Sequence, residues 1–76
     1  MNERKRKRLK DALKLLSSAL SIVESVKDDE QDDLDNIPEN LQGSTRYEAM
    51  ETAIDKLSDA ESSIDEAINS IEEAGG

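Results

Sequence analysis

A seven-residue repeat occupies both halves of this 76-residue chain and constrains its fold more than any other feature. Residues 53–74 read AIDKLSD, AESSIDE, AINSIEE and a closing alanine, so alanine recurs at every seventh position and a large aliphatic residue follows four positions later. Residues 12–25 repeat the arrangement as ALKLLSS and ALSIVES. Because heptad spacing places residues on one side of an α-helix, both segments are predicted to be amphipathic helices that share a seam of small residues.

The two repeats are separated by a short segment, residues 36–44, that is predicted to be the connecting loop. Pro38 disfavours helix at the residue before it and suits a first helical turn, so residues 38–41 are expected to form one turn of their own. Ile37 and Leu41 are expected to fold inward and close this end of the molecule.

Capping signals fix the start of the second helix. Thr45 followed by Glu48 has the spacing of a capping box, and Ser44 is the alternative cap. The sequence therefore predicts an all-α fold: a single domain of residues 1–76, folded as an antiparallel two-helix hairpin with helices at about residues 3–35 and 45–74.

The two heptad blocks lie at equal distances from Asn40, which suggests a pairing of the helices. If the loop folds symmetrically, Leu9 faces Ile71 and Leu16 faces Ile64. The same pairing sets Leu34 beside Tyr47 and the basic start of the chain beside Glu72 and Glu73. Glu61 falls in an otherwise apolar column of the second helix, so we expect its carboxylate either to reach water or to meet a cation from this chain or from another.

The first helix carries one more apolar column than the second can cover. Its surplus column consists of Leu15 and Ile22, whereas the matching column of the second helix is polar. We therefore expect the hairpin to form a homo-oligomer, as a helical bundle. The predicted protein interface comprises Leu15, Ile22, Ala12, Ala19, Ile54 and Ile68.

Charge is distributed unevenly along the chain, whose net charge is −9. Residues 1–27 carry eight Lys or Arg and three acids, a net +5, whereas residues 28–76 carry two bases and sixteen acids, a net −14. Residues 1–8 are predicted to be a basic N-terminal arm. It is either a solvated tail that frays, or a contact arm for nucleic acid, a membrane surface or an acidic partner. The candidate contacts for an anion or a partner are Arg4, Lys5, Arg6, Lys7, Arg8, Arg46 and Tyr47.

Composition argues against several classes of function. The chain has no cysteine or histidine and a single aromatic residue, so we predict no cofactor, no metal site, no catalytic residues and no stacking platform for nucleic acid. Asp28, Glu30, Asp32 and Glu39 match acidic positions of a calcium loop, but Asp33 stands where that loop requires glycine, and a solvated acidic helix end is the favoured interpretation. No apolar run is long enough to cross a bilayer, and a cytoplasmic location without membrane contact is expected.

The turn and the start of the second helix carry a family resemblance. The matching residues are Asn36, Ile37, Pro38, Glu39, Leu41, Gln42, Tyr47, Glu48, Met50 and Glu51. In these positions the chain resembles short uncharacterised helical proteins of phages, prophages and mobile elements of Gram-positive bacteria. The resemblance implies a source and no activity. In size and layering the chain also resembles the Rop-type hairpin, which dimerises into a four-helix bundle; this second likeness concerns architecture only.

These observations predict a non-enzymatic interaction protein that self-associates and acts by binding an unidentified host or phage protein. Two alternatives stay open. The acidic second helix could act as a decoy for nucleic acid, or an oligomer could enclose a small anion and so counteract a host defence. The basic arm could instead bind nucleic acid, which the −14 on the rest of the chain disfavours.

Overall fold

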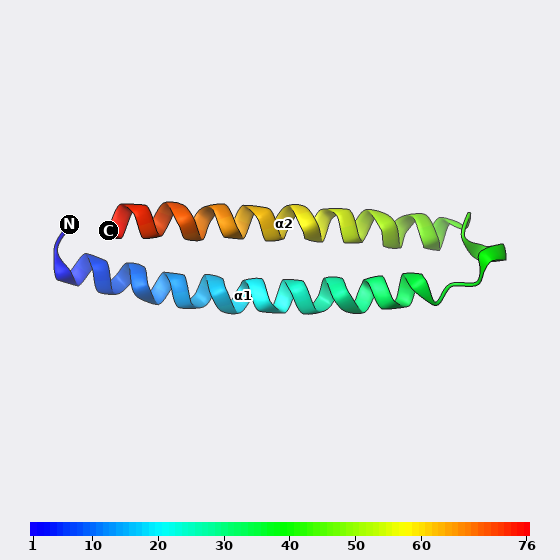
Figure 1. The fold of residues 1–76 in the computed structure, drawn as a ribbon, viewed down its shortest axis with the longest axis horizontal. Helices are drawn as coiled ribbons and strands as arrows, with labels where there is room; N and C mark the ends of the chain where they lie inside the picture. Colours follow the sequence, from blue (N-terminus) through cyan, green and yellow to red (C-terminus); the bar gives the residue numbers. More distant parts are fainter.

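The computed structural model describes residues 1–76, and the chain forms an antiparallel helical hairpin (Figure 1). Helix α1 spans Glu3–Asp35, a short 3-10 turn η1 spans Glu39–Leu41, and helix α2 spans Thr45–Gly75. The predicted all-α hairpin is confirmed, because α1 and α2 pack against each other along their length.

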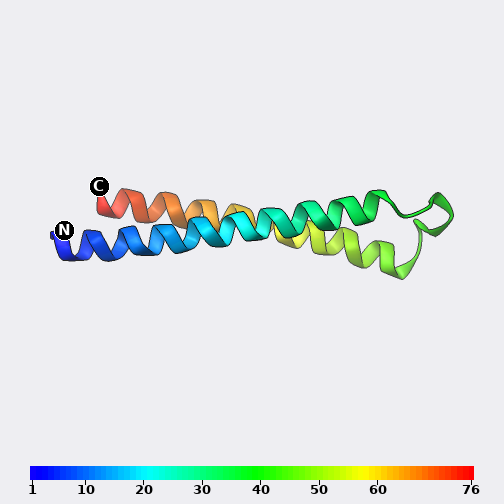
Figure 2. The ribbon, with the colours of Figure 1, turned by 90° about the horizontal axis from the view of Figure 1, so that it is seen from below.

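The hairpin is a rod rather than a rounded domain. Its extents are 60 × 14 × 13 Å and its radius of gyration is 17.4 Å, whereas a compact chain of this length would have a radius of gyration of about 11 Å. When the rod is turned by 90° about its long axis, the two helices are seen to cross at a shallow angle (Figure 2). Only three residues are buried, and each still has 9% of its surface exposed, so most of the contact between the helices lies along a line rather than in a central core.

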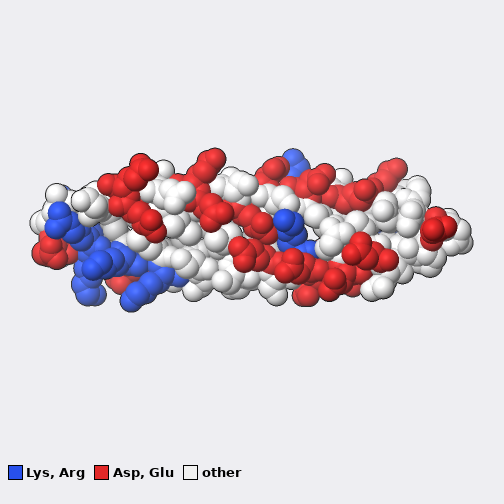
Figure 3. All heavy atoms as spheres, in the orientation of Figure 1, with Lys and Arg blue, Asp and Glu red and all other residues white.

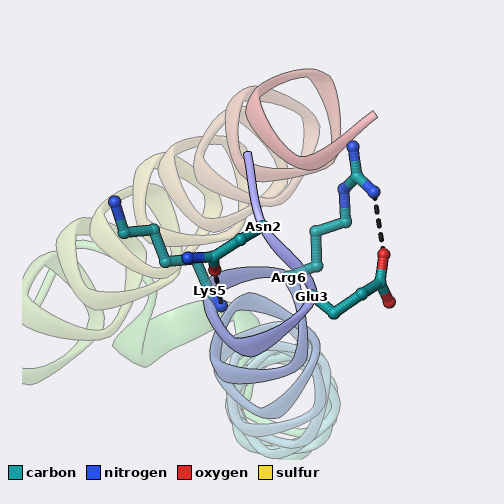
Figure 4. Close-up of polar contacts among 4 residues, drawn as sticks. All are labelled: Asn2, Glu3, Lys5 and Arg6. Atoms are coloured by element: carbon teal, nitrogen blue, oxygen red, sulfur yellow. Dashed lines mark hydrogen bonds and ion pairs between the residues drawn. The ribbon is translucent and has the colours of Figure 1, made fainter.

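Helix α1 begins inside the basic segment. The Asn2 side chain accepts a hydrogen bond from the backbone N–H of Lys5 at 2.8 Å, which satisfies one free amide of the first turn (Figure 4). Glu3 forms an ion pair with Arg6 at 2.9 Å in the same turn. Residues 4–8 are therefore helical, as the predicted start at about residue 3 implies, and the first turn has its own cap and an acidic residue.

A seam of large side chains joins the two helices. We call it the hairpin seam. Its buried and half-buried positions are spaced alternately by three and four residues, as in coiled-coil contacts. On α1 they are Leu9, Leu13, Leu16, Leu20, Val23, Lys27, Glu30 and Leu34; on α2 they are Tyr47, Met50, Ile54, Leu57, Glu61, Ile64, Ile68, Ile71 and Gly75.

The alanine columns flank the hairpin seam instead of forming it. Each half-buried alanine directly precedes a seam residue, as Ala12 precedes Leu13 and Ala60 precedes Glu61. A displacement of one residue is a rotation of about 100° around a helix, so the alanines stand at the edge of the contact. The predicted shared seam of small residues is therefore corrected: the large aliphatic columns make the contact, and the alanines line one side of it.

The pairing of the helices also differs from the prediction. A Cβ atom placed on Gly75 would lie 3.5 Å from Cδ1 of Leu9, so Leu9 is level with Gly75, one turn beyond its predicted partner Ile71. The other end agrees, because Leu34 packs with Met50 and Ile54, which lie further along α2 than the predicted neighbour Tyr47. As a result α1 extends past the C-terminal end of α2 (Figure 1).

The loop packs one apolar residue against the helices and leaves another exposed. Residues 38–41 form the predicted single turn, with the Leu41 N–H donating to the Pro38 carbonyl at 2.9 Å. Ile37 packs against the buried cluster of Leu34, Met50 and Ile54, as does Tyr47, which is half-buried. Leu41 remains 50% exposed, so the prediction that it folds inward and closes the end of the molecule is wrong.

The cap of α2 is Ser44, the alternative of the two predicted caps. Its Oγ accepts a hydrogen bond from the Tyr47 N–H at 3.1 Å, and Thr45 is the first helical residue. Ser44 has the extended backbone conformation that such caps require, with φ −73° and ψ 158°.

Substituting the cap should have a measurable effect. Ser44→Ala is expected to lower the free energy of unfolding by about 1 kcal/mol, because it leaves the Tyr47 N–H without its side-chain partner. Thr45→Ala is the matched control and should change the free energy by less than about 0.5 kcal/mol. Thermal unfolding followed by circular dichroism measures both; equal losses at the two positions would contradict the assignment of the cap.

Candidate protein-interaction surface

Helix α1 carries a second apolar seam that α2 does not cover. It consists of Ala12, Leu15, Ala19, Ile22 and Val26, which are again spaced by three and four residues. Leu15 is 73% exposed, Ile22 64% and Val26 49%, which makes them three of the five large apolar residues left exposed on the molecule. We call this set the outer seam.

Helix geometry places the outer seam away from α2. Leu15 precedes Leu16 of the hairpin seam by one residue, which turns its side chain by about 100° around the axis of α1. A single partner helix covers one such stripe, whereas α1 presents two. Leu15 and Ile22 are therefore exposed in the hairpin, as expected for a column that α2 cannot cover.

The outer seam lies on the side of the hairpin that carries the alanines of both helices. In an antiparallel pair, the positions that directly precede the seam residues of the two helices lie on the same side of the contact. Ala12 and Ala19 thus share a side with Ala60 and Ala67, and all four are half-buried. Small, uncharged side chains of α2 therefore lie next to Leu15 and Ile22, whose larger side chains project from α1.

Charges are concentrated at the two ends of α1. Lysine and arginine side chains gather over its N-terminal end and acidic side chains over its C-terminal end, with an uncharged stretch between them (Figure 3). Glu24 is the only charged residue between Leu15 and Val26. The exposed apolar residues of α1 therefore lie between a basic and an acidic block.

The structure separates the six predicted interface residues into two groups. Leu15, Ile22, Ala12 and Ala19 lie on the outer seam. Ile54 is 9% exposed and packs with Leu34 and Met50, and Ile68 is a half-buried residue of the hairpin seam. These two are used within the hairpin, so their assignment to a contact between protomers is corrected.

The basic segment makes its ion pairs within α1. Arg6 pairs with Glu3, and Lys7 lies 4.0 Å from Asp11. Arg6 also lines a shallow pocket with Lys10 and with Glu72 at the end of α2, but no ion pair joins the basic segment to α2. The predicted pairing of the basic segment with Glu72 and Glu73 is therefore not formed. Arg4, Lys5 and Arg8 are exposed and without ion-pair partners.

Arg46 and Tyr47 do not form a joint site. Tyr47 packs against the buried cluster at the loop end, as predicted. Arg46 is exposed and lines a hollow with Asp33, Ile37 and Met50, in which Tyr47 takes no part. Arg46 makes no ion pair within the hairpin.

One polar contact inside the hairpin seam was missed by the sequence analysis. Lys27 Nζ lies 3.4 Å from Glu61 Oε2, with the side chains 29% and 21% exposed. The cation that Glu61 requires thus comes from the same chain. Lys27 continues the column of Leu13 and Leu20 at heptad spacing, and extending that column past the apolar residues would have identified it.

The acidic end of α1 forms no group of three carboxylates arranged to hold a metal ion. Neither helix is both long and apolar enough to cross a lipid bilayer. Comparisons with protein-family models, with curated proteins and with solved structures find no match. The resemblance to mobile-element proteins therefore stays a prediction, and the function must be argued from the surface itself.

Proposed function

We propose that this protein is a non-enzymatic interaction module that self-associates through the outer seam and acts by binding proteins. The observation that carries the proposal is the exposure of Leu15 and Ile22, at 73% and 64%, in the uncharged middle of a helix. Isolated apolar residues are common on protein surfaces, but a contiguous apolar stripe at heptad spacing is typical of a helix that packs on a further helix.

The exposed area of the hairpin supports the same conclusion. The chain exposes 5736 Å² at a mass of 8.4 kDa, whereas a compact monomer of that mass exposes about 4,600 Å². The excess, about 1,100 Å², is similar to the roughly 800 Å² that each partner buries in a stable protein–protein interface. A second hairpin on the outer seam would give the molecule the buried surface that two helices alone do not provide.

The energetic gain is concentrated in two residues. Fully burying a leucine or isoleucine side chain contributes about 1.5–3 kcal/mol, and Leu15 and Ile22 retain most of their surface for that purpose. Ala12 and Ala19 beside them allow a partner helix to approach closely. The polar and acidic sides of the hairpin offer no comparable apolar area.

Sedimentation equilibrium tests the proposal. We expect the wild-type protein to form a defined oligomer at micromolar concentration, and the double substitution Leu15→Ser/Ile22→Ser to be monomeric while circular dichroism still reports a helical protein. Leu41→Ser is the matched control, since Leu41 is a 50% exposed apolar residue outside the outer seam. A wild-type protein that stays monomeric up to high micromolar concentration would contradict the proposal.

A further inference from the structure

The two ends of α1 carry opposite charge on either side of the outer seam. Residues 4–14 contain seven Lys or Arg and one acid, whereas residues 28–35 contain six acids and no base. Arg4, Lys5 and Arg8 have no ion-pair partner in the hairpin, and of the six acids none forms an ion pair. The charge of both blocks is thus available to a partner.

We propose that the outer seam is occupied by helix α1 of a second copy running antiparallel, so that each copy places its basic block beside the acidic block of the other. This inference rests on the proposed self-association and specifies its geometry. The two-fold axis would pass near the middle of α1, between Ala19 and Ile22. Ala19 then lies opposite the second copy's Ile22 and Leu15 opposite its Val26, an arrangement that sets large residues against smaller ones.

The same arrangement extends to the charged ends. Arg8 and Asp33 continue the two columns of the outer seam at heptad spacing, beyond Leu15 and Val26 respectively. A two-fold axis at the middle of α1 places Arg8 of each copy opposite Asp33 of the other copy. The dimer therefore contains this contact twice. Two unpartnered groups of the hairpin thereby acquire oppositely charged neighbours.

The charge pattern disfavours the other ways of covering the seam. A parallel α1 pair would place seven bases beside seven bases and six acids beside six acids. Packing the outer seam on the second copy's α2 would place the acidic end of α1 beside a helix with nine acids and two bases. Only the antiparallel α1 pair brings opposite charges together at both ends.

Distance measurement between spin labels tests the orientation. The chain has no cysteine, so Gln42→Cys provides a single labelling site in the loop without altering either helix. Antiparallel pairing places the two loops at opposite ends of the assembly, and a label-to-label distance of about 60 Å is expected from the 60 Å length of the rod. A distance below about 30 Å would show that the loops lie together and would overturn the antiparallel inference while leaving self-association intact. The absence of any intermolecular distance would instead overturn the proposed function.

A charge-exchange experiment tests the pairing of the blocks independently. Arg4→Glu/Arg8→Glu and Asp32→Lys/Asp33→Lys are each expected to weaken self-association at least about tenfold, because each places like charges opposite each other at positions 8 and 33 and lowers the net charge of its block from +6 to +2 or from −6 to −2. Mixing the two variants should restore association as a heterodimer, measured by native mass spectrometry. Added salt should weaken the wild-type dimer. Unchanged self-association of both variants, or a dimer that strengthens with salt, would overturn the inference.

Discussion

The double substitution Lys27→Met/Glu61→Leu is expected to raise the free energy of unfolding by about 2 kcal/mol, whereas Lys27→Met alone is expected to lower it by about 1 kcal/mol. The pair lies in the hairpin seam with less than a third of either side chain exposed. The electrostatic attraction between Lys27 and Glu61 offsets the free-energy cost of removing their two charges from water. Apolar side chains of similar volume would not incur that cost. The single substitution leaves Glu61 in the seam without its cation.

Thermal unfolding at one fixed protein concentration measures both effects, and fixing the concentration is necessary because self-association stabilises the folded state. For a domain of this size, 2 kcal/mol corresponds to a shift in Tm of about 8–16 °C. Lys56→Met is the matched control: it removes an exposed lysine of α2 outside the seam and should change Tm by only a few degrees. A double variant no more stable than the single one would contradict the placement of this pair in the seam.

Ile54→Ala is expected to lower the free energy of unfolding by about 3 kcal/mol, because it removes the centre of the buried cluster formed with Leu34 and Met50. A chain of this length has a total stability of about 4–11 kcal/mol, so the loss is a large share of it. Urea unfolding followed by circular dichroism measures the change.

Leu41→Ala serves as the comparison for this experiment. Leu41 is 50% exposed in the loop, and its truncation should cost less than about 1 kcal/mol. Comparable losses at Leu41 and Ile54 would show that the loop end is not closed by the cluster as described.

The helices and their limits could be predicted from the sequence because local signals determine them. Heptad spacing indicates where each helix lies, and Pro38 excludes helix through the loop. The predicted second helix ends one residue before the observed end at Gly75. The choice between Ser44 and Thr45 as cap could not be made, since both side chains can accept the same kind of hydrogen bond.

The pairing of the helices could not be predicted, because it depends on how the loop folds. A pairing that is symmetric about Asn40 places corresponding heptad positions of the two helices opposite each other, such as Leu9 and Ile71. The spacing of the heptads is compatible with this pairing. In the structure, different heptad positions of the two helices lie at the same level, and Leu9 is level with Gly75. The contact between Lys27 and Glu61 was missed for the same reason, since a pairing that sets Leu16 opposite Ile64 does not bring these two residues level with each other.

The exposed surface was partly predictable. Leu15 and Ile22 could be identified because α2 has no apolar column to match theirs, a comparison that requires no knowledge of the pairing. Ile54 and Ile68, which adjoin alanines, were predicted to belong to the same surface. Only the three-dimensional arrangement shows that they face α1 and that the alanines stand at the edge of the contact.

The central claim is that α1 uses one seam for α2 and the other for a second copy of the chain. Isotope-filtered NMR on an equal mixture of labelled and unlabelled protein tests it most directly, because only contacts between copies give signals. The account predicts intermolecular contacts from the methyl groups of Leu15, Ile22 and Val26 and none from Leu16 or Leu20, which face α2 in their own chain. Intermolecular contacts from Leu16 and Leu20, or none from Leu15 and Ile22, would contradict it.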